Sequence, residues 1–259
     1  MLIVEKRYLS RDKLFGFLDH VEKNDNPFLT VYLKPYSSED SAETPGSGTG
    51  DLPRVIKDAL AAGPVSQEIH YRNTGACVFW CESNESYIVL PPLPIIDEKS
   101  FSGKAATEML RHHASLEPVI WLILITWGSY AVCVVKGDIL LSRKLGTGFI
   151  HKKHKKGGSS QKRFARRTEE QKKDFLRKVA NRIEETVHGY PPDHVFFGGN
   201  RLIIKPLLNY CSILESEAAR ISKRFPEIRY ADKESMQQAV ETLNTAVVFT
   251  IRAVPEKPD

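Results

Sequence analysis

The hydrophobic positions in the first third of the chain follow two different periods. Between residues 11 and 24, four apolar residues recur at helical spacing: Leu14, Phe17, Leu18 and Val21. Residues 28–33, FLTVYL, have the composition of a strand, and the apolar runs at 75–80 and 86–90 predict a β-hairpin. Residues 52–62 predict another helix. This mixture is typical of a small α/β module.

The second half of the chain has a clearer strand pattern, followed by a long helix. Apolar runs at 119–126, 130–135 and 139–143 predict three strands joined by tight turns. An apolar stripe at three-to-four spacing then predicts the helix: Phe175, Leu176, Val179, Ile183 and Val187. Two starts remain open for it. A continuous helix places Phe164 on the same stripe, whereas residues 168–171 have the form of a capping box and would begin the helix later.

Strands continue to alternate with helices to the end of the sequence, with strand composition at 194–197 and 247–254. Such alternation predicts an α/β fold in which helices cover a layered, mixed sheet. We therefore expect two domains, a smaller N-terminal α/β module over residues 1–115 and a layered domain over residues 116–259. A chain of 259 residues is long enough for both.

Composition narrows the class of protein. The longest apolar run, at 119–126, is too short to span a bilayer, and the N-terminal residues lack the layout of a secretory signal, so we expect a cytoplasmic protein. No metal site or cofactor is expected. The four cysteines lie apart, mostly within apolar runs, which favours buried thiols over zinc ligands: Cys77, Cys81, Cys133 and Cys211.

The net charge of +5 is concentrated in one segment. Residues 151–178 hold twelve lysines and arginines against three acidic residues, so the remainder of the chain is slightly acidic. A basic segment of this kind is expected to bind a polyanion. Its sequence has a distinct order, with HKKHKK at 151–156, then GGSSQ, then KRFARR at 162–167.

Ordinary interpretations of this segment are a solvated charged face, a nuclear-localisation run or a plain surface loop. The order of residue types favours a more specific one. Cationic side chains on both sides suit phosphate contacts with RNA, and two glycines let a backbone approach another surface closely. A glutamine amide can hold a water or donate to a developing oxyanion. The pattern predicts a basic glycine loop over residues 146–167 that enters an active site built of RNA.

Residues 157–166, GGSSQKRFAR, resemble the GGQ loop of archaeal and eukaryotic class 1 peptide-chain release factors. In that family Gly-Gly-Gln is followed by a pair of small residues, a spacer and Arg-Phe-Ala-Arg. Here RFAR stands at 163–166, in the family spacing from the glycines, and Gln161 comes two residues later than in the pattern. This variant is closer to the Vms-like release factors of ribosome quality control, and the chain resembles a prokaryotic stand-alone member. The resemblance covers about residues 116–259.

The resemblance implies a release-factor central domain that hydrolyses peptidyl-tRNA on the large ribosomal subunit without reading a codon. Gly157 and Gly158 would permit close approach to the tRNA 3′ end, and Gln161 would position water at the ester. The implied partners are ribosomal RNA and peptidyl-tRNA, with no membrane, and no domain that would recruit a GTPase partner is evident. Eight basic side chains would grip RNA phosphates: Lys152, Lys153, Lys155, Lys156, Lys162, Arg163, Arg166 and Arg167.

Two other functions remain open at this point. One is a non-catalytic ribosome- or RNA-binding module on the same fold, in which the loop only docks. The other is a nuclease, although the sequence lacks the carboxylate cluster of two-metal chemistry. We also expect the loop to be mobile without RNA, the helix to be firm only from about Thr168, and Phe164 to pack at the base of the loop.

Overall fold

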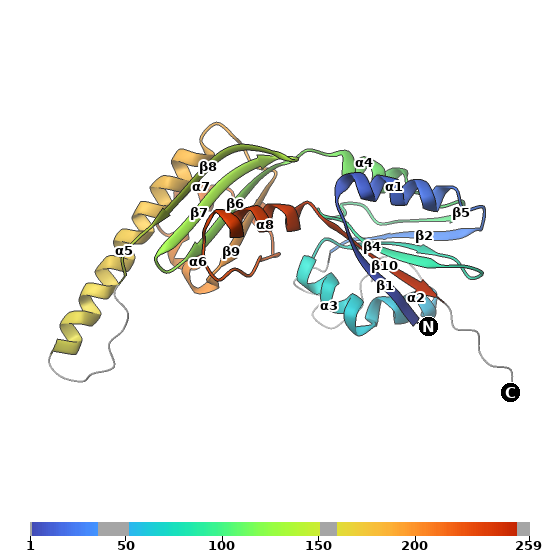
Figure 1. Cartoon of the computed structure of the whole chain (residues 1–259), viewed down its shortest axis with the longest axis horizontal. Helices are drawn as coiled ribbons and strands as arrows, with labels where there is room; N and C mark the ends of the chain where they lie inside the picture. Colours follow the sequence, from blue (N-terminus) through green and yellow to red (C-terminus); the bar gives the residue numbers. More distant parts are fainter. Residues whose placement is uncertain (1, 36–51, 151–159, 253–259) are drawn as a thin grey trace. The chain divides into compact units, whose positions relative to one another are not determined.

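A computed structural model describes residues 2–35, 52–150 and 160–252 of the chain (Figure 1). The chain folds into two compact units. The first comprises residues 1–116 and 242–259, and the second comprises residues 117–241.

The first unit is built on a six-stranded antiparallel sheet with the order β1-β10-β4-β3-β2-β5. Its strands are β1 (Leu2–Leu9), β2 (Phe28–Leu33), β3 (Ala76–Trp80), β4 (Ser86–Leu90), β5 (Lys99–Gly103) and β10 (Ala246–Arg252). The hairpin of β3 and β4 forms as the sequence predicts. In contrast, β1 and β5 have no clear apolar alternation and are not predicted.

Helices cover both faces of this sheet (Figure 1). On one face lie α1 (Arg11–Glu22) and α4 (Glu108–Ser115); on the other lie α2 (Arg54–Ala61) and α3 (Gly63–Arg72). The alternation of side chains along β10 serves both layers, because Val248 packs with the α1 core and Phe249 packs with the α2–α3 core. The first unit is therefore a three-layer α/β/α arrangement.

The position of β10 corrects the expected extent of the second domain. The sequence predicts a strand at 247–254 and assigns it to the domain over 116–259, but β10 pairs with β1 on one side and β4 on the other, inside the first sheet. A central strand that is buried on both faces appears in sequence as a continuous apolar run, here AVVFTI, and such a run does not indicate which sheet it joins.

The second unit is built on a four-stranded mixed sheet with the order β8-β7-β6-β9. Its strands are β6 (Val119–Thr126), β7 (Ser129–Lys136), β8 (Ile139–Thr147) and β9 (His194–Gly199). The first three form an antiparallel meander, and β9 runs parallel to β6. Parallel pairing needs a crossover, which α5 (Ser160–Val187) provides. The predicted fold class, a layered mixed sheet with helices, is confirmed.

One face of this sheet is covered by α5, α6 (Arg201–Leu208) and α7 (Ser212–Ser216). The apolar stripe of α5 is buried as predicted, with Val179 and Ile183 fully inaccessible in the same core as Trp121. A 3-10 turn (Ala218–Arg220) follows, and α8 (Lys233–Leu243) leads from the second unit back into the first.

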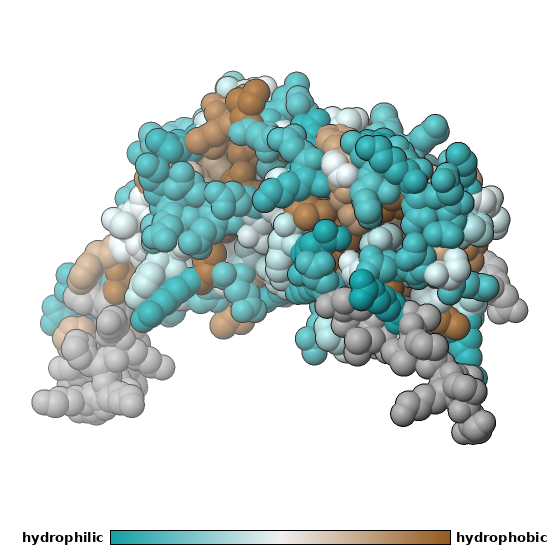
Figure 2. Space-filling view, turned by 45° about the vertical axis from the view of Figure 1, so that its right-hand side comes forward, coloured by the Kyte–Doolittle hydropathy of each residue, from teal (hydrophilic) through white to brown (hydrophobic). Residues whose placement is uncertain are grey.

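All four cysteines are buried and unpaired, so the prediction of buried thiols is confirmed. Burial raises the pKa of Cys133 to about 12 and that of Cys211 to about 11. Within the described ranges, no helix has the length and apolar character needed to cross a membrane. On the face drawn in Figure 2, hydrophilic residues cover most of the surface and hydrophobic ones emerge in separate patches.

Candidate nucleic-acid interface

The segment that carries the predicted site leaves the second sheet at the end of β8. Here the chain runs tightly against its neighbours. An added Cβ on Gly148 would lie 2.4 Å from Phe175 Cδ2, and one on Gly146 would lie 2.4 Å from the hydroxyl of Tyr130. The Gly148 amide donates to the Gly128 carbonyl at 2.9 Å. The two glycines thus let the strand end close against aromatic side chains.

Aromatic and cationic contacts fasten α5 to the same place. The Phe175 ring lies 6.2 Å from the rings of both Trp127 and Tyr130. Lys178 Nζ donates to the Thr147 carbonyl at 2.8 Å, which ties the helix to the last residue of β8. Lys172 Nζ lies 5.2 Å from the centroid of the Trp127 ring. Both ends of the segment between β8 and α5 are therefore fixed to one sheet.

The first turns of α5 extend beyond the strands (Figure 1). Residues 163–167 are all exposed, and from Arg163 onward, where the side chains of α5 are described, the first buried one is Phe175. From Ser160 to Phe175 the helix rises about 22 Å, at 1.5 Å per residue. The C-terminal half of α5, which packs in the core, thus supports an N-terminal half that is exposed and basic.

Acidic side chains of α5 pair with bases of the same helix. Glu169 pairs with Lys172 at 2.7 Å, Glu170 with Arg166 at 3.1 Å and Asp174 with Arg177 at 3.1 Å. The Arg166 pair is very exposed, with 84% and 59% of the two side chains accessible. Exposed pairs of this kind contribute about 0–1 kcal/mol and give way readily to another anion.

Arg163 and Arg167 form no ion pair with any described residue, and both are exposed. Their spacing of four places them on one face of α5, and Arg166 is a neighbour on the same side. Three guanidinium groups in this arrangement present planar donors that suit phosphate oxygens.

The predicted site residues fall into three groups. Arg163, Arg166 and Arg167 lie together on the exposed half of α5. Gln161 and Lys162 belong to the first turn of that helix, where only their backbone is described. The remaining six lie outside the described residues: Lys152, Lys153, Lys155, Lys156, Gly157 and Gly158. The expectation that the intervening loop is mobile lies outside them as well.

The start of α5 corrects one expectation. The helix is continuous from Ser160, not from Thr168. The capping-box interpretation fails because the Thr168 hydroxyl donates to the Phe164 carbonyl at 3.0 Å, one turn back, as in a helix interior. Phe164 is 49% exposed and lies outside the buried core, so the expected packing at the loop base is made by Phe175 instead.

Sequence reasoning missed the residues that fix the base of the segment. The signal for them was present, because Gly146 and Gly148 stand at the end of a strand, and two glycines at such a place mark a close backbone approach. Trp127, at the turn between β6 and β7, carried no comparable signal, since its role depends on a helix nearly fifty residues later.

Fold and interface together define an α/β protein whose second unit holds a basic, glycine-containing segment between a β-meander and a long helix. The family model described as the Actinobacteria/chloroflexi VLRF1 release factor matches residues 118–248. That match covers just over half of the chain, and the chain belongs to this release-factor family. No curated protein matches it in sequence.

Solved structures with a similar course of the chain include the archaeal translation termination factor aRF1, at 18% identity and a TM-score of 0.38, covering 91% of this chain and 72% of that one. Pelota of Archaeoglobus fulgidus has 11% identity and a TM-score of 0.32, and the match covers 94% of this chain and 67% of that one. Dom34 of S. cerevisiae has 8% identity and a TM-score of 0.29, and the match covers 93% of this chain and 67% of that one. The family places the protein, at a general level, in translation termination or ribosome rescue.

Proposed function

We propose that this protein hydrolyses peptidyl-tRNA on the large ribosomal subunit without reading a codon, and so releases the nascent chain. The observation that carries the proposal is the exposed basic half of α5, with Gln161 in its first turn, continued directly from residues 157–159 and anchored by a buried half. Membership in a release-factor family supports the same function.

In this proposal the glycines allow the segment to enter the peptidyl-transferase centre, and the amide of Gln161 positions water at the ester carbonyl. The lysines at 152, 153, 155, 156 and 162 bind RNA phosphates together with Arg163, Arg166 and Arg167. The ribosomal RNA supplies the surrounding site. Because Gln161 lies in the first turn of α5, its backbone is continuous with the anchored part of that helix.

The direct test is release of a labelled peptide from purified large subunits that carry peptidyl-tRNA. Gln161→Ala should lower the rate of release by about 10²-fold or more, as expected when one water- or oxyanion-positioning donor is removed. Gln171→Ala, the same chemical change ten residues further along α5, is the matched control and should release peptide at the wild-type rate. Equal release by wild type and Gln161→Ala would refute the catalytic role.

The arginines have their own test. Arg163→Gln combined with Arg167→Gln should weaken binding to the subunit and flatten its salt dependence, by about one unit of log K against log salt for each phosphate that is no longer neutralised. Arg177→Gln is the control, because Arg177 lies in the anchored half of α5, with its guanidinium carbon 5.9 Å from the centroid of the Tyr210 ring. A salt response that does not change would contradict the RNA contact.

A non-catalytic docking module remains the second candidate, and the same exposed basic helix favours it. It requires that the wild-type protein binds the subunit with the salt dependence described above but releases no peptide. The release assay separates the two functions in a single measurement.

A further inference from the structure

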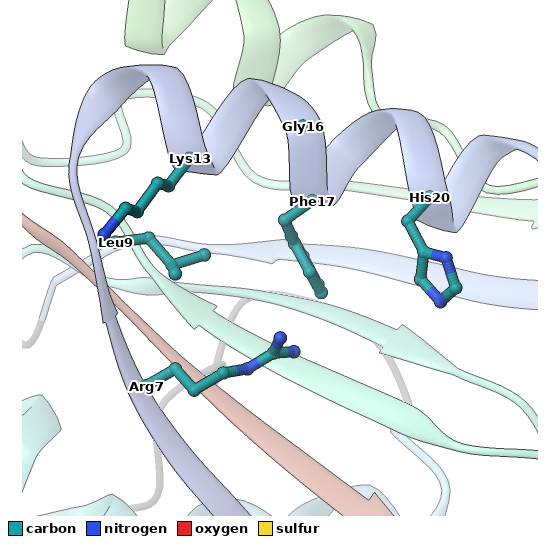
Figure 3. Close-up of a pocket in the computed structure, with 6 residues that line it drawn as sticks. All are labelled: Arg7, Leu9, Lys13, Gly16, Phe17 and His20. Carbon is teal, nitrogen blue, oxygen red and sulfur yellow. The ribbon is translucent and has the colours of Figure 1, made fainter.

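The first unit has an open pocket of about 340 Å³ between β1 and α1 (Figure 3). Six residues line it, two from the strand and four from the helix: Arg7, Leu9, Lys13, Gly16, Phe17 and His20. Among these described lining residues none is acidic, and three are cationic or become so on protonation. Figure 3 shows the side chains of Phe17 and His20 pointing from α1 toward the sheet, and the side chain of Arg7 extending from β1 into the space below Phe17.

Arg7 is held in place, and 39% of its side chain remains accessible. Its guanidinium carbon lies 5.6 Å from the centroid of the Phe17 ring, and Phe17 is itself fixed by an edge contact with Tyr87 at 5.2 Å. Its Nε lies 3.4 Å from a carboxylate oxygen of Glu5, yet this buried nitrogen makes no hydrogen bond. A guanidinium that is oriented by an aromatic ring and partly accessible is suited to bind an anion.

Gly16 has no explanation in the protein itself. It lies on the exposed side of α1, where glycine costs about 1 kcal/mol relative to alanine. Its φ is not positive, and a Cβ built on it would meet no atom within 4 Å. Neither backbone conformation nor packing requires glycine here. The missing side chain leaves the pocket open at this point of α1.

We propose that this pocket binds a phosphate group of RNA, which gives the first unit an RNA contact separate from residues 151–178. Arg7, Lys13 and His20 have side chains of different length that can donate to the phosphate oxygens. Leu9 and Phe17 offer an apolar surface to the adjoining sugar or base. The pocket stands out within its unit, which has 14 lysines and arginines against 18 acidic residues. RNA as the source of the phosphate rests on the proposed function.

Gly16 gives a test that separates charge from shape. Gly16→Glu places a carboxylate at the pocket, and Gly16→Gln places a neutral side chain of the same size there. Both should leave the protein at least as stable as wild type, because both replace glycine in a helix. Binding of a labelled single-stranded RNA by the full chain is measured by fluorescence anisotropy over a range of salt. Gly16→Glu should bind about tenfold more weakly than Gly16→Gln at 0.1 M salt, the effect expected when one phosphate is no longer bound. Equal binding by the two variants overturns the proposal.

Lys13 gives a second, independent test. Lys13→Gln should flatten the salt dependence by about one unit, whereas Lys23→Gln, an exposed lysine just after α1 that does not line the pocket, should not. If both variants weaken binding equally, the effect is one of general charge and the pocket is not the site.

Competition identifies the source of the phosphate. Inorganic phosphate and a free nucleoside monophosphate should displace the RNA weakly, because each offers a single contact without the rest of the strand. Displacement by the free nucleotide as effective as that by unlabelled RNA would overturn RNA as the ligand. The release assay is separate. If wild type releases no peptide but Gly16→Glu still binds RNA more weakly than Gly16→Gln, the proposed function alone is refuted. If wild type releases peptide but the two variants bind RNA equally, the pocket alone is refuted.

Discussion

At the scale of single residues, Arg72 is a charged group of the first unit that is almost fully buried, with 1% exposed. Its Nε donates to Glu68 at 2.9 Å and its Nη1 donates to the Thr245 carbonyl at 2.6 Å. Glu68 also accepts from Lys6 Nζ at 2.7 Å. Burial raises the pKa of Glu68, but the hydrogen bonds from Lys6 and Arg72 outweigh it and hold that pKa below its ordinary value. One guanidinium thus joins α3 to the residue before β10.

Arg72→Met should lower the free energy of unfolding by about 3–5 kcal/mol, because it leaves the Glu68 carboxylate partly buried with one cation fewer. Urea unfolding at neutral pH measures this. Arg252→Met is the control: its pair with Glu85 is exposed and should be worth about 1 kcal/mol at most. Equal losses in the two variants would contradict the role of burial.

The pH dependence of the same comparison follows from the lowered pKa of Glu68. The stabilisation is present above the ordinary carboxyl value of 4.5 and is lost as pH falls through the lower value of the folded state. The difference between wild type and Arg72→Met should therefore shrink below pH 4.5.

At the scale of elements, α5 combines an anchored half with a projecting half. The anchor depends on the close approach of β8 to Phe175, where Gly148 leaves room for the ring. Because the strand end and the helix are locked together there, a change at Gly148 acts on both flanks of the basic segment.

Gly148→Ala should destabilise the second unit by about 1–3 kcal/mol, since the new methyl group forces the Phe175 ring or the strand to move. Thermal unfolding and the release assay should both detect it. Gly63→Ala is the control, as a Cβ there meets nothing within 4 Å and the backbone is not strained. A neutral Gly148→Ala variant would show that the contact is readily relieved.

The elements also show how far sequence reasoning reaches. Helices and strands with a regular apolar period, such as α1 and β6, are predicted to within a few residues. β1 is missed because Glu5, Lys6 and Arg7 interrupt its pattern at an edge of the sheet, and β5 because all of its residues are exposed. Charge alone is enough to locate the basic segment. The start of α5 is not predictable in this way, because a local capping signal at Thr168 competes with a helix whose stability comes from packing further along.

At the scale of the whole molecule, β10, the last strand of the described residues, returns the chain to the sheet of the first unit. β10 separates β1 from β4, and without it neither has a partner on that side. Removing the residues after Asn244 should therefore unfold the first unit, with loss of far-ultraviolet circular dichroism and exposure of Trp80, which is 7% accessible when folded. A chain ending at Arg252 keeps β10 and should remain folded. An intact first unit in the shorter chain would contradict this role.

The same arrangement reverses the usual order of folding during synthesis, in which N-terminal domains form first. The strands of the second unit are all made by residue 199, whereas the first sheet waits for residues 246–252. Until then β1 and β4 present unpaired edges and apolar faces of the kind that attract other chains or proteases. A copy of this protein whose own translation stopped short of β10 would thus be marked for removal by its unfinished first unit, even with its second unit complete.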